Sequence, residues 1–281
     1  MSRVVITGAA GYLGSALARA LAPDFEVFGL DLAPLPECIP GRQVDLGDYE
    51  SAREALEGAS LLANCASIHP WKPYTDEQYV QLNIQGTWNV LKAASAAGIE
   101  RLVHTSSIAV TGYEPGPEGS PVKEANAPQA PRDLYSLTKA TQEHACAVWH
   151  RASSLPIAML RPPAFFPTPP AESVANLLAA RLLLPDLVEA HVAALKTAFT
   201  GLEAYYTTGW VPYAPQESEE LRSHPQAVVE RYWPGAVEKL ARLGASVPPI
   251  HLWWDISKAE RAFGWRPRLT FEVALEEALN G

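Results

Sequence analysis

Short apolar segments alternate with helical patterns along the first 160 residues of the chain. Predominantly apolar runs predict strands, buried in a parallel sheet, at 4–7, 26–31, 42–46, 61–67, 101–107 and 157–161. Apolar positions at helical spacing predict helices between these strands, and the longest are 76–97 and 134–151. This alternation predicts an α/β fold with a doubly wound parallel sheet.

The pattern changes after Pro162 and Pro163, which end the last of these strands. Two further helices are predicted at 173–184 and 186–198, followed by a short strand at 204–209. Five of the eight tryptophans lie within residues 210–265. We therefore expect one domain at 1–163, with 186–209 returning to it, and a smaller, discontinuous C-terminal substrate domain at 164–185 and 210–281.

Three glycines directly follow the first predicted strand, at Gly8, Gly11 and Gly14. This spacing lets the backbone turn tightly and approach a pyrophosphate, which the free N–H groups of the helix that opens at Tyr12 would bind. The second strand ends in Asp31, where a carboxylate accepts hydrogen bonds from an adenosine ribose and repels a 2′-phosphate. We predict a Rossmann domain that binds NAD rather than NADP, the alternative being an ordinary glycine turn before a core helix.

Composition narrows the function further. The formal net charge of −9, without a run of Lys or Arg, argues against nucleic acid and anionic membrane as partners. The three cysteines have no disulfide or metal pattern, and no histidine has metal-ligand spacing, so we expect no metal site. No apolar run of 18 residues occurs, and a strand is predicted from residue 3 onward, so we expect a cytoplasmic protein without a signal peptide.

Tyr135 and Lys139 lie one helical turn apart on the helix 134–151. Free tyrosine has a pKa near ~10 and is a poor base, but a nearby ammonium favours the phenolate. Ser107, at the end of a central strand, can donate a hydrogen bond to the same reacting oxygen. This arrangement predicts proton transfer at a substrate hydroxyl or carbonyl, the alternative being a Tyr and a Lys on a helix surface.

Five short motifs in this sequence resemble those of the extended short-chain dehydrogenase/reductase family, also called the NAD-dependent epimerase/dehydratase family. They are Thr7-Gly8-x-x-Gly11-x-x-Gly14, Asn83-x-x-Gly86-Thr87, Thr105-Ser106-Ser107, Tyr135-x-x-x-Lys139 and Leu160-Arg161-Pro162. Val188–Leu195 and the tail from Asp255 to Pro267 are also similar to segments of that family. The resemblance runs almost end to end.

The resemblance implies a set of site residues. The catalytic residues would be Ser107, Tyr135 and Lys139. Cofactor contacts would come from Gly8, Gly11, Tyr12, Leu13, Gly14, Asp31, Leu32, Asp45, Leu46, Cys65, Ala66, Ser67, Asn83, Thr105, Ser106, Tyr135, Lys139 and Pro162. On the substrate side we expect His69, Ile108, Ala109 and Ala164.

Departures from the family pattern bear on the reaction. Ile108 and Ala109 occupy the positions of the dehydratases' Asp-Glu pair, which argues against water elimination. Residues 162–166 lack the asparagine that many nucleotide-sugar epimerases carry there, so UDP recognition by that route is not expected. We predict an oxidoreductase that acts on a sugar, a sugar acid or a nucleotide sugar, either as an epimerase or as a net dehydrogenase.

Two further points stay open at this stage. A dinucleotide-binding sensor or scaffold without turnover is the competing function, although such proteins usually lack the Tyr-x-x-x-Lys pair. By resemblance, the helices 76–97 and 134–151 would pair two copies into a homodimer. We expect His191 to lie at the surface or in an interface.

Overall fold

The computed structural model describes residues 1–112, 119–127 and 129–280. Its seven strands form one sheet in the order β3-β2-β1-β4-β5-β6-β7, and the five neighbouring pairs from β3·β2 to β5·β6 are parallel. The strands are β1 (Arg3–Thr7), β2 (Glu26–Asp31), β3 (Gly41–Gln43), β4 (Leu61–Asn64), β5 (Arg101–Thr105), β6 (Ile157–Arg161) and β7 (Leu202–Tyr206). The predicted doubly wound parallel sheet is confirmed.

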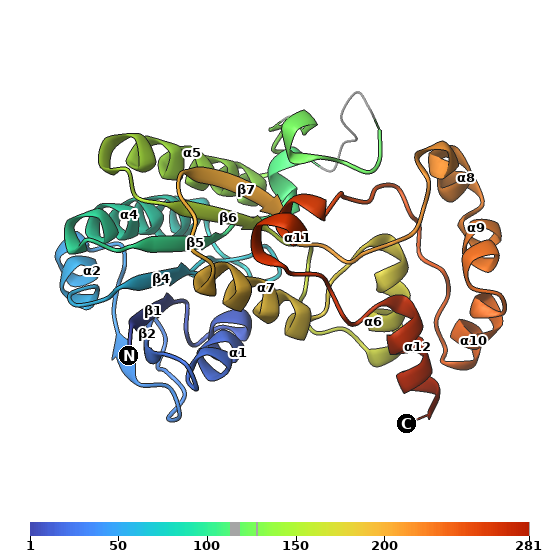
Figure 1. Cartoon of the computed structure of the whole chain (residues 1–281), viewed down its shortest axis with the longest axis horizontal. Coiled ribbons are helices and arrows are strands. Elements are labelled where there is room, and N and C mark those ends of the chain that lie inside the picture. Colours follow the sequence, from blue (N-terminus) through green and yellow to red (C-terminus); the bar gives the residue numbers. More distant parts are fainter. Residues whose placement is uncertain (113–118, 128, 281) are drawn as a thin grey trace. The chain divides into compact units, whose positions relative to one another are not determined.

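Helices cover both faces of this sheet (Figure 1), with α2, α4 and α5 on one face and α1 and α7 on the other. Their bounds are α1 (Tyr12–Leu21), α2 (Tyr49–Ala55), α4 (Gly86–Ala97), α5 (Leu134–Ser153) and α7 (Leu184–Lys196). Buried apolar residues of β1, β2, β4, β5 and β6 pack against α2, α4 and α5, namely Val5, Leu30, Leu62, Leu102 and Ile157. The core therefore fixes the sheet's register, and the carboxyl ends of its strands share one edge.

The segment predicted as one helix at 76–97 is not a single α-helix. It begins with a capping box at Thr75 and a short α3 (Asp76–Gln78), continues as a π-helix, η1 (Tyr79–Gln85), and becomes α-helical only in α4. The Gly86 N–H accordingly bonds to the Gln81 carbonyl, five residues back. Wide turns of this kind are rare and often lie at functional sites.

Other boundaries also differ from the sequence pattern. The strand expected at 42–46 ends at Gln43, because Asp45 turns the chain by accepting a hydrogen bond from the Gly47 N–H at 2.8 Å. The helix expected at 173–184 is α6 (Pro170–Asn176) followed by the 3-10 turn η4 (Leu177–Ala179). Two further 3-10 turns are η2 (Ile108–Thr111) and η3 (Glu124–Asn126).

The chain divides into two compact units. The first comprises Met1–Gly112, Gln129–Arg161 and Val188–Tyr205. The second comprises 119–127, Pro162–Leu187 and 206–280 of the described residues. This division differs from the expected domains chiefly in assigning 119–127 to the smaller unit, where Val122 forms a bridge to Trp254.

The second unit is built from short helices around an aromatic core. Tyr213 makes edge-on ring contacts with Trp233 and Trp253, and Trp233 in turn contacts Phe271. Of the C-terminal tryptophans, Trp253, Trp254 and Trp265 are buried, as expected for core formers. The helices are η5 (Pro215–Glu217), α8 (Ser218–Ser223), α9 (Pro225–Tyr232), α10 (Ala236–Arg242), α11 (Ser257–Phe263) and α12 (Phe271–Asn280).

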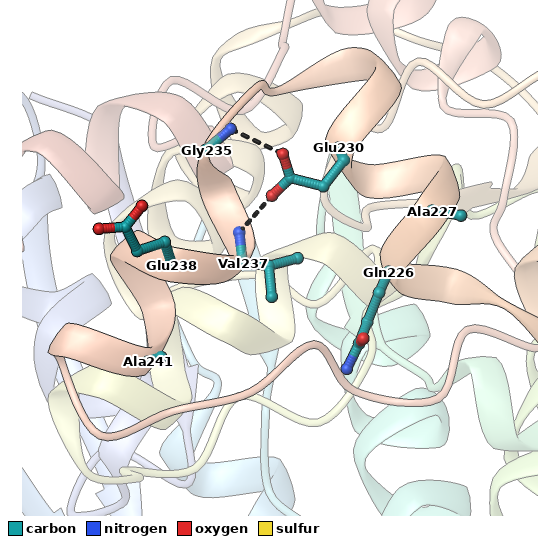
Figure 2. Close-up of a pocket in the computed structure, with 7 residues that line it drawn as sticks. All are labelled: Gln226, Ala227, Glu230, Gly235, Val237, Glu238 and Ala241. Atoms are coloured by element: carbon teal, nitrogen blue, oxygen red, sulfur yellow. Dashed lines mark hydrogen bonds between the residues drawn. The ribbon is translucent and has the colours of Figure 1, made fainter.

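Two carboxylates stabilise this unit by accepting hydrogen bonds from backbone N–H groups. Asp186, buried at the start of α7, accepts hydrogen bonds from the backbone N–H groups of Arg268 and Leu269. Glu230 of α9 accepts from the N–H groups of Gly235 and Val237 and so caps α10 beside a shallow groove (Figure 2). No helix in the described part of the chain is long and apolar enough to cross a membrane.

Candidate active site

The glycine loop between β1 and α1 fits a group that needs close backbone approach. Gly8 has a φ of +71°, a conformation that favours glycine, and a Cβ at Gly14 would lie 2.1 Å from the Gly8 carbonyl oxygen. Gly11 is the N-cap of α1 and provides no side-chain acceptor for the first turn. The N–H groups at Tyr12 and Leu13 are therefore suited to bind a pyrophosphate.

Asp31, the last residue of β2, lies beside this loop. Its carboxylate accepts hydrogen bonds from the N–H groups of Ala10 and Ala33, both at 2.9 Å. These bonds fix the side chain and leave further lone pairs on both oxygens for ribose hydroxyls. The carboxylate is thus fixed beside the glycine loop, and its expected contact with an adenosine ribose stays a prediction.

A polar chain crosses the carboxyl ends of β1, β4 and β5. Thr7 accepts a hydrogen bond from the Ala66 N–H and donates one to Asn64 at 2.6 Å. The Asn64 amide donates to Nδ1 of His104. Burial lowers the pKa of His104 to about 3, so this imidazole is neutral. These hydrogen bonds fix the loop that begins at Cys65, and none of the three side chains that form them carries a charge.

Asn83, in the π-helix, uses its whole side chain within the protein. Its carbonyl oxygen accepts from the Ile68 N–H and the Ser67 hydroxyl, and its amide donates to the Ile68 carbonyl and to Thr138 of α5. The side chain is fully buried. Asn83 therefore positions the loop after β4, and the direct cofactor contact expected of it stays a prediction.

Ser107 caps the 3-10 turn that follows β5. Its Oγ accepts a hydrogen bond from the Ala109 N–H at 3.1 Å, and its hydroxyl proton remains available for a reacting oxygen. Ile108 and Ala109 follow directly, and both side chains are buried. Their expected substrate contacts stay predictions, and their burial leaves little side-chain surface for such contacts.

Lys139 is a buried cation at the centre of the site. Its side chain is only 1% exposed, and Nζ donates to the Thr105 carbonyl at 2.9 Å. Nζ lies 6.0 Å from the ring centroid of Tyr135, one turn earlier on α5. Burial lowers the pKa of Lys139 to about 8, opposed by the negative potential of neighbouring groups such as Glu143. The predicted pair thus combines a buried Lys139 with a half-buried Tyr135, rather than two side chains on a helix surface.

Tyr135 also contacts the ring of His69, from the loop after β4. The His69 ring stacks on Trp71 with centroids 4.5 Å apart and lies 5.2 Å from the Tyr135 ring. Burial, followed by the charge of Lys139, lowers the pKa of His69 to about 3. A neutral imidazole therefore lies against the phenol ring, and the expected contact of His69 with a substrate stays a prediction.

His191 is not at the surface, contrary to our expectation. It is fully buried on α7, and its Nε2 is hydrogen-bonded to the Thr105 hydroxyl at 2.8 Å. The same hydroxyl contacts the thiol of Cys65, whose pKa burial raises to about 11. Thr105 is therefore held from both faces of the sheet, through its side chain by His191 and through its carbonyl by Lys139.

The remaining predicted residues differ in their exposure and in the unit to which they belong. Leu13 and Ser106 are buried, whereas Tyr12, Leu32 and Asp45 are exposed beside the carboxyl ends of β1, β2 and β3. The Asn89 amide fixes the turn that follows Asp45, because it donates hydrogen bonds to the carbonyls of Leu46 and Gly47. Pro162 and Ala164 belong to the second unit, and their expected contacts stay predictions.

Within residues 1–112, 119–127 and 129–280, no three His, Cys, Asp or Glu side chains form a group that could hold a metal ion. The described site brings together a phenol, a hydroxyl and an ammonium, at Tyr135, Ser107 and Lys139. These groups can transfer a proton and stabilise charge on an oxygen, and neither step changes the oxidation state of a carbon.

Comparison with known proteins identifies the family. Residues 4–183 match the family model described as "NAD dependent epimerase/dehydratase family". The chain belongs to this family. Its cofactor is accordingly NAD, and the chain is an enzyme of the dehydrogenase and epimerase type, an extended short-chain dehydrogenase/reductase as the motifs indicated.

Individual relatives agree with this assignment. The chain is 25% identical over 238 residues to the uronate dehydrogenase of Pseudomonas syringae pv. tomato, which covers 78% of this chain and 84% of that protein. Its fold is similar to a short-chain dehydrogenase/reductase superfamily protein from Agrobacterium tumefaciens (TM-score 0.75, 21% identity, covering 99% and 96% of the two chains). It is also similar to the UDP-glucuronic acid 4-epimerase of Bacillus cereus (TM-score 0.71, 22% identity, 98% and 96%).

Sequence reasoning missed the residues that hold the family's motifs in place. Asn64, Asn89, Glu143 and His191 each hydrogen-bond to a group more than 30 residues away in the sequence. The available signal was polarity inside an apolar run, as in Leu61-Leu62-Ala63-Asn64. Such a residue must find a buried hydrogen-bond partner, because an unpaired one would be costly.

Asp31 should control which dinucleotide the family's cofactor site accepts. Replacing Asp31 by Asn removes the charge that opposes a 2′-phosphate and one of the two acceptors that fix the side chain. We expect the ratio of the NADP to the NAD dissociation constant to fall by about tenfold. Fluorescence titration of both dinucleotides measures it. Asp24→Asn, which alters an exposed ion pair with Lys196, is the matched control, and an unchanged ratio in Asp31→Asn would contradict the assignment.

The buried ammonium of Lys139 predicts a pH-dependent stability. The folded pKa of about 8 lies below the ordinary 10.5, so between these values the unfolded chain holds a proton that the folded chain has lost. The free energy of unfolding should rise with pH in this window by about 1.4 kcal/mol per unit, and no slope from Lys139 is expected below it.

Lys139→Met removes this contribution, so the difference between wild type and variant should grow in favour of wild type from pH 8 to 10. Urea unfolding of the cofactor-free protein at several pH values measures it. The exposed Lys92→Met should show no such difference. Parallel pH profiles for wild type and Lys139→Met would mean that Lys139 is not buried as described.

Proposed function

We propose that this protein is an NAD-dependent dehydrogenase of a sugar acid, in which Tyr135 takes the proton of the substrate hydroxyl. The observation that carries the proposal is the buried Lys139 ammonium next to Tyr135, with the Ser107 hydroxyl at the end of the adjoining strand β5. Burying a cation lowers the stability of a fold. A sensor or a scaffold that only binds a dinucleotide does not need such a cation beside a phenol.

Each residue has a defined part in this proposal. The Lys139 ammonium favours the Tyr135 phenolate, which removes the hydroxyl proton as the carbon is oxidised. Ser107 donates a hydrogen bond to the same oxygen. His69, held against Tyr135 as a neutral ring, would contact the sugar. Asp31 and the glycine loop would hold NAD, which supplies the hydride acceptor when bound.

The choice of a sugar acid is supported by sequence and by relatedness. The uronate dehydrogenase relative aligns along most of both chains. Residues 162–164 are Pro-Pro-Ala and offer no side-chain amide for a nucleotide, a departure from many nucleotide-sugar epimerases. A 4-epimerase acting on a nucleotide sugar is the second candidate, favoured by the structural similarity to the UDP-glucuronic acid 4-epimerase.

A substrate panel distinguishes these functions. Purified protein is incubated with NAD and free uronic acids, neutral sugars or UDP-sugars, while NADH absorbance and isomer composition are followed. We expect NADH to form with a uronic acid. Isomer exchange of a UDP-sugar without net NADH would instead establish the epimerase. NAD binding without turnover of any substrate in the panel would favour the sensor and contradict the proposal.

Tyr135→Phe tests the proposed role directly. Loss of the proton acceptor should lower kcat by about 10³-fold, while the dissociation constant of NAD changes by less than about threefold. Tyr49→Phe is a matched control, because Tyr49 also lies beside a lysine, with Lys92 Nζ 3.6 Å from its ring centroid. Turnover of substrate by the Tyr135→Phe variant at the wild-type rate would remove Tyr135 from the mechanism.

We also propose that two copies pair through η1, α4 and α5. Exposed large apolar side chains gather on these elements, and they are Val80, Trp88, Leu137 and Val148. Trp88 and Val148 line an apolar groove together with Ile84 and Ala145. A two-fold pairing would cover this face with the same face of a second copy.

Val148→Glu should weaken this dimer, since each substitution enters a two-fold interface twice. We expect the dimer dissociation constant to rise by at least about 30-fold, measured by sedimentation equilibrium. Val273→Glu is the control, because Val273 is similarly exposed (39% against 42%) but lies on α12 of the second unit. A wild-type protein that stays monomeric at about 100 μM would rule out the pairing.

A further inference from the structure

Glu143 is a buried acid on the same helix face as the Tyr–Lys pair. It follows Tyr135 by eight residues and Lys139 by four, so the three side chains project from successive turns of α5. Its side chain is only 2% exposed. The roles proposed above for Tyr135, Lys139 and Ser107 do not use it.

Four donors share the two oxygens of this carboxylate. The Ser106 hydroxyl donates to Oε1 at 2.6 Å, and the Arg161 guanidinium donates to both oxygens, at 2.8 Å from Nε and 2.7 Å from Nη2. The Gln129 amide donates to Oε2 at 3.1 Å. Bidentate Arg–carboxylate pairs of this kind fix orientation as well as distance.

These contacts join three elements at one edge of the sheet. Ser106 directly precedes Ser107 at the end of β5, Arg161 is the last residue of β6, and Glu143 belongs to the helix that carries Tyr135. A buried ion pair is in itself weak evidence for stability, because removing two charges from water offsets much of their attraction. Its fixed geometry at these three positions suggests a different role.

We infer that Glu143 is a positioning residue, which holds the Ser107 hydroxyl in register with the Tyr135 phenol through the Ser106 hydroxyl. This inference rests on the proposed roles of Tyr135 and Ser107. The step is short, since a hydrogen bond from Ser106 to Glu143 fixes the Ser106 side chain and one peptide unit links Ser106 to Ser107. Misplacement of a reacting group by about 1 Å can lower a rate by about 10²-fold.

A charge-neutral double variant separates positioning from stability. Glu143→Gln alone leaves the buried Arg161 without its partner charge and would destabilise the fold. Glu143→Leu combined with Arg161→Met removes both charges, and such apolar replacements are often neutral for stability. Ser106 then loses its acceptor. Ser106→Ala cuts the same link while the ion pair stays intact.

Two readouts are measured in both variants. The first is kcat against KM for the substrate found in the panel, where we expect kcat to fall by about 10- to 100-fold while KM changes by less than about threefold. The second is hydrogen exchange of the Ala109 amide, which donates to Ser107 Oγ. Its exchange should become about tenfold faster, and this readout needs no substrate.

Leu56→Ala is the control for stability alone. Leu56 is buried in the core that α2 and α4 share, so this variant should lose stability while its kcat and its Ala109 exchange stay at wild-type values. Wild-type kcat and wild-type Ala109 exchange in the double variant and in Ser106→Ala would overturn the inference. Absence of turnover in the wild type would instead count against the proposed function, and the Ala109 exchange would still decide the role of Glu143.

Discussion

The site depends on one buried contact, between the Lys139 ammonium and the carbonyl of Thr105. Removing an ammonium from water is costly, and a single carbonyl compensates for only part of that cost. The pKa of Lys139 is lowered by burial, which is the direction expected when part of this cost remains. In the mechanism that we propose, this penalty has a use, because the positive charge lies one helical turn from Tyr135 and would favour its phenolate.

Much of the surrounding structure holds the two partners of this contact in place. Thr105 is fixed through its side chain by His191 of α7, from the face of the sheet opposite to α5. The helix that carries Lys139 is linked to the π-helix through Asn83 and Thr138. All of these bonds lie near the carboxyl ends of parallel strands. The backbone ladder stops at this edge of the sheet, so the groups there need other hydrogen-bond partners.

The sequence predicts the parts of the site whose function is local. A glycine at Gly8 or Gly14 is required by backbone conformation and by close approach, and the spacing of Tyr135 and Lys139 follows from one helical turn. Asp31 could be placed because the end of an apolar strand is visible in the pattern. For the same reason, the alternation of strands and helices along the chain could be predicted, whereas the order of the strands within the sheet was not.

The missed features depend on partners that are distant in sequence. Glu143 finds Ser106 and Arg161 across 37 and 18 residues, and no periodicity marks such a meeting. His191 was expected at the surface because the helical pattern of 186–198 does not reveal which face covers the sheet. The π-helix at Tyr79–Gln85 was missed because its apolar spacing is compatible with an ordinary helix.

The most direct test of the central contact is a crystal structure of the protein with NAD and an inert substrate analogue. We predict that the Tyr135 phenol oxygen and the Ser107 hydroxyl both lie within about 2.6–3.2 Å of one analogue oxygen, with Lys139 Nζ still bonded to the Thr105 carbonyl. An analogue oxygen beyond reach of the phenol, or a Lys139 side chain turned away from Thr105 into solvent, would contradict this account.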